Sequence, residues 1–151
     1  MAVDASSGAQ QKQLLKVIWL AMLAAVGSYT VVCLLMVGME DAGRRAENDG
    51  LRYAFTAVAA VMGALSAWWR WRFITGQSVE EEPSTLSPAR LQTHSLVVWA
   101  LSEAVAIVGL VMGLLTQSFM EFFPFGVAAA ALLLLHRPSN LAFDRLENTG
   151  Q

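Results

Sequence analysis

Residues Leu96–Leu115 read LVVWALSEAVAIVGLVMGLL, and this stretch decides what kind of protein the chain is. At 1.5 Å per residue, a helix of about 20 apolar residues is long enough to cross the hydrocarbon core of a bilayer. The stretch also carries one carboxylate, Glu103. A charged side chain deep in a membrane helix costs at least about 2.5 kcal/mol on insertion scales, so such a residue indicates a functional site.

The composition of the whole chain agrees with a membrane protein. Of 151 residues, 56% are hydrophobic and 15% are charged, whereas an ordinary soluble domain has about 25% charged residues. The charges are also segregated, since none falls in residues 17–39, 53–69, 104–120 or 122–136. These four uncharged stretches predict an all-α integral membrane protein.

We expect one membrane domain over residues 1–151, folded as an up-down-up-down bundle of four transmembrane helices. The polar stretches assign residues 75–92 to a linker and 138–151 to a tail. Pro124 falls early in the last span, so that helix either begins there or bends there. The predicted spans are about 14–37, 53–72, 95–115 and 119–135.

The basic residues predict the orientation of this bundle. With four spans, both termini and the 75–92 linker lie on one side of the membrane. That side holds seven lysines and arginines and the other side holds three, so the positive-inside rule places both termini in the cytoplasm. We expect the chain in a bacterial inner (plasma) membrane. The seven are Lys12, Lys16, Arg70, Arg72, Arg90, Arg137 and Arg145, and the three are Arg44, Arg45 and Arg52.

A run of tryptophan and arginine closes the second span. Indole rings favour the headgroup level of a bilayer and guanidinium groups reach phosphate, so this run predicts interface anchors that contact the lipid bilayer. The run ends an apolar helix and the net charge of the chain is only −2, so we expect no nucleic-acid partner. The predicted anchors are Trp68, Trp69, Arg70, Trp71 and Arg72.

Small residues form a stripe on the helix that carries Glu103. At 100° per residue, Ser102, Ala106, Gly109 and Gly113 fall on one face, with Glu103 at its flank. Two small residues four positions apart let another membrane helix approach closely. We therefore predict that Ala106, Gly109 and Gly113 pack against a neighbouring helix, as does Gly63 in the second span.

The other spans offer Glu103 few polar partners. Ser66 is expected about one turn from it, whereas Ser28, Tyr29 and Thr30 lie nearer the outer half of the first span. No lysine, arginine or histidine is expected at its depth. Low dielectric disfavours the charged form, so we expect a mostly protonated side chain at pH 7. Glu103, Ser102 and Ser66 then form a candidate site for a proton or cation.

Two local patterns concern the helix ends. Ser118 with Glu121 three residues later matches a capping box, in which each side chain binds a backbone amide of the other residue. The first and third spans open with similar residues in the same phase, Val17-Ile18-Trp19 and Val97-Val98-Trp99. An internal repeat of two helical hairpins is therefore possible from the sequence but is not established by it.

The sequence favours no enzyme. It contains no HExxH, paired-carboxylate or nucleophile constellation and no glycine-rich phosphate loop, and one carboxylate does not make an active site. Both histidines, His94 and His136, fall at helix ends, where capping is a commoner role than catalysis. Cys33 is the one cysteine, which excludes a disulfide within the chain and favours a buried apolar thiol. We expect no catalytic residue, metal site or cofactor.

The segment Ala100–Val111, read ALSEAVAIVGLV, resembles the ion-carrying helix of the rotor-ring subunit c of rotary ATP synthases. In that family a carboxylate followed by alanine, an apolar stretch and Gly-Leu-Val carries the translocated proton or sodium ion. The resemblance implies that Glu103 is the ion-binding carboxylate, with Ser102 beside it. It covers about a dozen residues, and the linker lacks the family's short polar loop. The whole chain looks like a small four-span bacterial membrane protein.

Two functions remain open. In the first, the chain is a small membrane subunit whose Glu103 binds a proton or cation inside a larger complex. In the second, it is a structural or assembly subunit in which a protonated Glu103 holds helices together. Either function implies other membrane subunits, or further copies of the chain, as partners.

Overall fold

The computed structural model describes residues 4–37, 49–72 and 88–138, and these residues are all-α. They form four helices: α1 over Asp4–Val37, α2 over Asp49–Arg70, α3 over Pro88–Thr116 and α4 over Phe119–Leu135. Helix α1 begins well before the predicted span, and α3 begins inside the predicted linker. The rest of that linker, and the tail beyond Pro138, lie outside the described residues.

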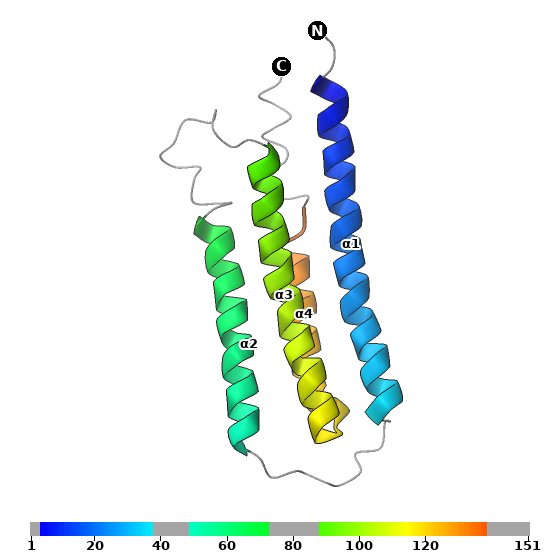
Figure 1. Cartoon of the computed structure of the whole chain (residues 1–151), viewed down its shortest axis with the longest axis vertical. Coiled ribbons are helices and arrows are strands. Elements are labelled where there is room, and N and C mark those ends of the chain that lie inside the picture. Colours follow the sequence, from blue (N-terminus) through cyan, green and yellow to red (C-terminus); the bar gives the residue numbers. More distant parts are fainter. Residues whose placement is uncertain (1–3, 38–48, 73–87, 139–151) are drawn as a thin grey trace.

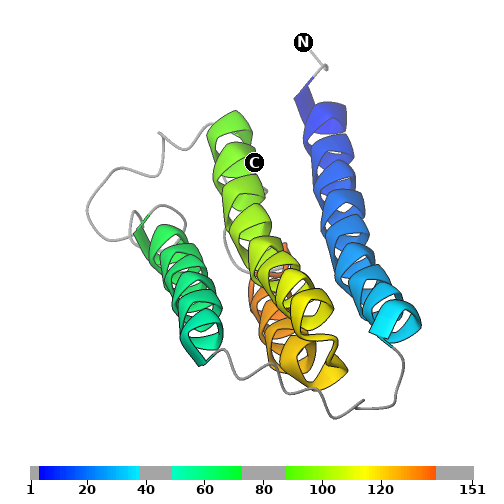
Figure 2. The ribbon, with the colours of Figure 1, turned by 60° about the horizontal axis from the view of Figure 1, so that its bottom comes forward.

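The helices pack together with α3 in the middle (Figure 1). Helices α1 and α2 lie on opposite sides of α3, and α4 lies behind it, as the second view also shows (Figure 2). Contacts at the helix ends fix the directions. Trp19, near the start of the apolar segment Gln13–Val37 of α1, reaches the end of α4, and Arg52 at the start of α2 reaches the start of α4. Consecutive helices therefore run in opposite directions.

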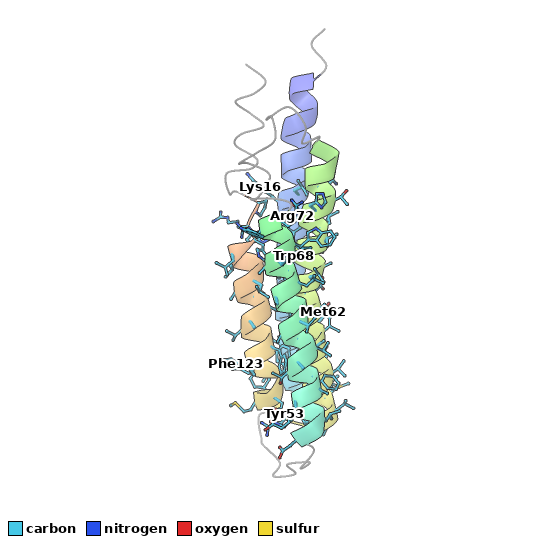
Figure 3. The ribbon with its side chains drawn as sticks, turned by 90° about the vertical axis from the view of Figure 1, so that its left-hand side faces the viewer. Lys16, Tyr53, Met62, Trp68, Arg72 and Phe123 are labelled. Carbon is cyan, nitrogen blue, oxygen red and sulfur yellow. The ribbon has the colours of Figure 1, made fainter. Side chains whose placement is uncertain are left out.

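Three helices contain segments long and apolar enough to cross a membrane: Gln13–Val37, Asp49–Arg70 and Gln92–Thr116. Helix α4 is equally apolar but has only 17 residues, about 26 Å at 1.5 Å per residue. Large apolar side chains cover the outside of the bundle, among them Leu35, Tyr53 and Phe123 (Figure 3). Such an outward apolar surface suits contact with lipid rather than water.

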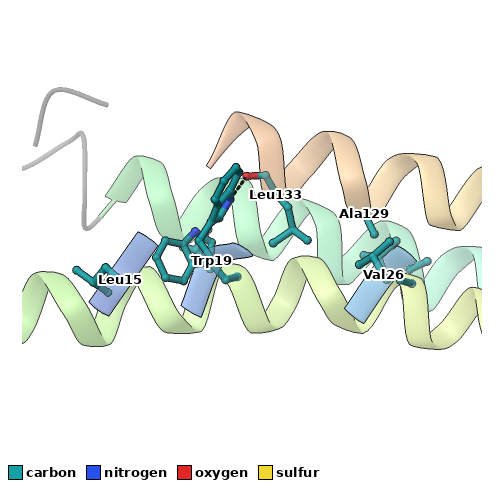
Figure 4. Close-up of a cluster of buried hydrophobic side chains, with 10 residues drawn as sticks. Leu15, Trp19, Val26, Ala129 and Leu133 are labelled. Atoms are coloured by element: carbon teal, nitrogen blue, oxygen red, sulfur yellow. Dashed lines mark hydrogen bonds between the residues drawn. The ribbon is translucent and has the colours of Figure 1, made fainter. Parts of the chain in front are cut away.

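The buried core lies where α3 and α4 meet α1. Trp19 of α1 lies beside Leu133 of α4 and Val26 lies beside Ala129, with Leu15 further along α1 in the same buried cluster, as the close-up shows (Figure 4). Only 11% of the α1 span and 11% of the α2 span are buried, against 44% of the α3 span. Helix α3 is therefore the one around which the others assemble.

The small residues of α3 face α4. Ala106 is fully buried, and a Cβ atom built on Gly109 would overlap Phe125. A Cβ atom on Gly113 would lie 2.9 Å from Phe122 Cβ and 3.0 Å from the buried Cys33 Sγ. Gly63 of α2 is less crowded, with its nearest neighbour, Leu132 Cδ1, at 3.6 Å.

A tight turn joins α3 to α4. Gln117 has a φ angle of 52°, and Ser118 N–H donates to Gly113 C=O over 3.0 Å. This arrangement is the Schellman motif, in which a left-handed residue lets the chain reverse and pairs an unsatisfied carbonyl. Helix α4 then begins at Phe119, so Pro124 lies inside it and does not start it.

The capping-box prediction at the start of α4 is wrong. Ser118 occupies the N-cap position, but its side chain makes no capping hydrogen bond. The carboxylate of Glu121 instead pairs with Arg52 of α2, at 2.7 Å and 3.1 Å. Because the Glu121 carboxylate is paired with Arg52, it is not available to the backbone amide of Ser118, which donates to Gly113 C=O instead of completing a capping box.

The glycine contacts generate a stability prediction. We expect Gly109→Ala to lower the free energy of unfolding by about 1–3 kcal/mol, the usual cost of overpacking a tight interior. The matched control is Gly27→Ala, because a Cβ atom there meets nothing within 4 Å; replacing a helical glycine in open space stabilises by about 0.5–1 kcal/mol. Reversible unfolding in detergent micelles measures both. Equal effects of the two substitutions would contradict the packing described here.

Candidate functional site

Glu103 lies near the middle of the α3 span, at the contact with α1. The Tyr29 hydroxyl of α1 donates a hydrogen bond of 2.7 Å to Glu103 Oε1. Both side chains are half-buried. The sequence offered three polar residues of the first span as possible partners of Glu103, and Tyr29 is the one that binds it. The bond joins two helices with a neutral donor instead of a cation.

Ser102 and Ser66, the other two residues of the candidate ion site, lie on a different side of α3. Both are fully buried. Their Oγ atoms are 3.1 Å apart, and each lies within hydrogen-bonding distance of Val98 C=O. Neighbouring residues on a helix point about 100° apart, so Ser102 faces α2 and α4 while Glu103 faces α1. The structure thus brings the two serines together and leaves Glu103 apart from them.

The two serines surround the ring of His136, just beyond the end of α4. His136 Nδ1 lies 3.3 Å from Ser102 Oγ and 3.5 Å from Ser66 Oγ. The direction of these hydrogen bonds depends on the imidazole tautomer. His136 is buried, and the cluster of Ser66, Ser102 and His136 joins α2, α3 and α4 at one end of the bundle.

Side chains from the other three helices bind the last carbonyl groups of α4. Trp19 Nε1 donates to Leu133 C=O over 2.8 Å, and Arg70 donates to Leu135 C=O. Trp99 Nε1 donates to His136 C=O over 2.9 Å. We call Trp19, Arg70 and Trp99 the α4 cap.

Backbone amides bind the remaining carbonyls at this end. His136 N–H donates to Leu132 C=O and Arg137 N–H donates to Leu134 C=O. Every carbonyl from Leu132 to His136 therefore has a donor. A helix end leaves such carbonyls without partners inside the helix, and in a bilayer each unpaired one costs several kcal/mol.

The predicted interface anchors divide into two groups. Trp68 and Trp71 are exposed, at 49% and 65% of their surface, and Figure 3 places Trp68 and Arg72 near the same end of the bundle as Lys16. Trp69 and Arg70 turn inward, since Trp69 Nε1 donates to His94 Nδ1 over 3.2 Å and Arg70 belongs to the α4 cap. The tryptophan and arginine run thus contributes to packing as well as to the outer surface.

The two tryptophans of the α4 cap, together with His136, were not recognised from the sequence as one site. The repeated phase of Val17-Ile18-Trp19 and Val97-Val98-Trp99 was the available signal, because it gives both rings the same depth. Within the described ranges, no group of three or more histidine, cysteine or carboxylate residues is arranged to hold a metal ion.

The α4 cap generates a second prediction. Trp19→Phe and Trp99→Phe each keep the ring but leave a buried carbonyl without its donor, so we expect each to lower the free energy of unfolding by about 1–3 kcal/mol. Tyr53→Phe is the matched control, since it also keeps the ring and removes a side-chain donor, but its side chain is 75% exposed and the expected change is within about 0.5 kcal/mol. Unfolding in micelles measures all three. A Trp99→Phe protein as stable as the control would argue against the cap.

His136 generates a third prediction, on pH. Burial, and secondly the positive charge of Arg70, lower the pKa of His136 from 6.5 to about 4. Between these values the unfolded chain binds more protons than the folded chain, so stability falls as the pH falls from about 6.5 towards 4.

The shift corresponds to a loss of about 3 kcal/mol over this window, at about 1.36 kcal/mol per pKa unit. His136→Asn keeps a hydrogen-bonding side chain that does not titrate, so we expect a flatter profile in unfolding measurements from pH 4 to 7. An unchanged slope in this variant would assign the pH dependence to other groups.

Comparison with known protein families, with curated proteins and with solved structures found no match to this chain. The resemblance to subunit c therefore stands on residues 100–111 alone. The described residues form a four-helix all-α protein, three of whose helices have the length and composition of membrane spans.

Proposed function

We propose that this chain is a small structural or assembly subunit of a membrane complex, in which Glu103 holds α1 against α3. The observation that carries the proposal is the 2.7 Å hydrogen bond from Tyr29 to Glu103. It joins residues 74 positions apart within one chain. The sequence alone placed ion binding first, whereas the geometry favours the structural alternative.

The weak packing of α1 explains why such a bond is needed. Most of the α1 span is outside the core, and large apolar residues such as Leu20, Val31 and Leu35 are exposed. Between two membrane helices, lipid competes with apolar contacts, so polar bonds and close packing hold helices together. A hydrogen bond of this kind is worth about 0.6–2 kcal/mol. Tyr29 and Glu103 thus anchor one of the two least buried helices to the centre of the bundle.

A second candidate function is binding of a proton or cation by Glu103. The observation that favours it is that Glu103 is only half-buried and that its hydrogen-bond partner, Tyr29, is neutral, so among the described residues no cation is paired with it. Ser66 and Ser102, predicted to share this site, are engaged with His136. A bound ion would therefore need Tyr29 and a group outside the described residues.

The proposal includes a membrane arrangement. In it, all four helices span the bilayer of a bacterial inner membrane. The seven-to-three distribution of basic residues favours both termini in the cytoplasm. The shorter α4 spans by close pairing with α3. We propose no catalytic activity for the chain, whose partners are lipid and other membrane subunits.

Substitutions at the Tyr29–Glu103 pair separate the two functions. Gln keeps an oxygen that accepts the tyrosine hydroxyl and cannot ionise, so Glu103→Gln should change the free energy of unfolding by less than about 0.5 kcal/mol. Glu103→Leu and Tyr29→Phe should each cost about 1 kcal/mol. Ser28→Ala is the control, because exposed Ser28 binds only Ala25 C=O of its own helix.

Proton uptake on reconstitution into vesicles completes the test. We expect the purified chain and its Glu103→Gln variant to give the same signal. A Glu103→Gln protein that is stable but has lost a measurable proton uptake would replace the structural proposal by the ion-binding one.

A further inference from the structure

The carboxyl group of Glu103 is bonded on one side only. Tyr29 donates to Oε1, and the described residues offer Oε2 no hydrogen bond. Among these residues no buried side-chain oxygen or nitrogen lacks a partner. The Oε2 atom therefore reaches the surface of the bundle, near the middle of the α3 span.

A polar oxygen at that depth needs a partner from outside the bundle. The proposed membrane location, on which this inference rests, puts Oε2 in hydrocarbon, where lipid chains offer no hydrogen-bond donor. An unsatisfied polar group in this region is strongly disfavoured, and polar residues in membrane helices usually face other protein. The surface beside Glu103 thus differs from the largely apolar outer faces of α1 and α4, because it carries an oxygen without a hydrogen-bond partner among the described residues.

That surface is a bare strip of α3 between α1 and α2. Ala100, Ala104, Ile107 and Val111 follow one another at spacings of four, three and four residues, which places them along one side of the helix. Ile107 and Val111 are 44% and 40% exposed. Helices α1 and α2 lie on either side of α3 (Figures 1 and 2), and the exposure of Ile107 and Val111 indicates that they leave this strip uncovered.

The size of the side chains suits a helix as the occupant. Ala100 and Ala104 lie on either side of Glu103 in the sequence and are four residues apart, the small-residue spacing at which membrane helices approach closely. Ile107 and Val111 add apolar contact one and two turns further along. A helix lying on the strip would bring its own side chains within reach of Oε2.

We infer that the strip formed by Ala100, Glu103, Ala104, Ile107 and Val111 docks a transmembrane helix of a partner protein that carries a carboxamide side chain, Asn or Gln, at the depth of Glu103. A carboxamide fits both protonation states of the acid. Its N–H donates to a carboxylate, and its C=O accepts from a carboxylic acid O–H while the N–H donates in return. It also enters the bilayer uncharged, at lower cost than Lys or Arg.

A pair of synthetic peptides tests this inference against the full chain in phosphatidylcholine vesicles. One is an apolar helix of about 20 leucine and alanine residues with a single central asparagine, and the other has leucine at that position. Energy transfer between labelled peptide and labelled protein measures association. We expect the asparagine peptide to bind roughly tenfold more tightly, the range seen for hydrogen bonds between model membrane helices.

Variants assign the effect to the strip. Glu103→Leu should remove the preference for asparagine, whereas Glu103→Gln, which still pairs with an amide, should keep it. Ala104→Phe should weaken the binding of both peptides, and Val127→Phe on the exposed side of α4 is its matched control. Circular dichroism confirms that each variant is helical.

Equal binding of the two peptides to the wild-type chain, or a preference that survives Glu103→Leu, would overturn the inference. Self-association of the chain that depends on Glu103 and excludes the asparagine peptide would also overturn it, because a second copy would then be the occupant. These readouts are independent of the stability effect of Tyr29→Phe, so failure here is distinguishable from failure of the proposed structural role.

Discussion

The pairing of the last carbonyl groups of α4 is the constraint on which the rest of the structure depends. A short apolar helix that ends among buried residues, as α4 does at Leu133 and His136, cannot rely on water for its final carbonyls. The donors come from α1, α2 and α3, through Trp19, Arg70 and Trp99. Each of the other helices is thereby fixed in depth and rotation at one end of the bundle.

This constraint separates two polar regions that the sequence places one residue apart. Ser102 belongs to the end where α4 terminates and shares a buried cluster with Ser66 and His136. Glu103 points towards α1, where Tyr29 is its hydrogen-bond partner. The first region is closed and fully paired, whereas the second keeps one oxygen at the surface, so any exchange with a partner or an ion belongs to Glu103.

The fold was largely predictable because the charges are so unevenly distributed. Four uncharged stretches indicated four helices, and the described residues form four. The ends were less predictable: α1 extends to Asp4 and α3 to Pro88, since polar residues continue a helix without any break in hydrogen bonding. The capping box failed because Arg52, distant in sequence, competes for Glu121.

The candidate site was predictable in its central residue but not in its partners. Counting residues from the helix ends placed Ser66 at nearly the same depth as Glu103. This count does not give the rotation of a helix about its axis, and Ser66 faces Ser102 and His136 instead. Tyr29 was expected nearer the outer half of its span than Glu103. The repeated phase at Trp19 and Trp99 indicates a common depth, but it does not give the tilt of α1 that brings Tyr29 to Glu103.

The close contact between α3 and α4 has a consequence for how the chain enters a membrane. The turn at Gln117 and Ser118 is short, and Gly109 and Gly113 allow the close approach of Phe125 and Phe122. Helices α3 and α4 therefore form one tightly packed hairpin. A 17-residue helix is marginal as an independent span. Inserted together with α3, it shares the partitioning free energy of its partner, so the hairpin and not the single helix is the natural unit of insertion.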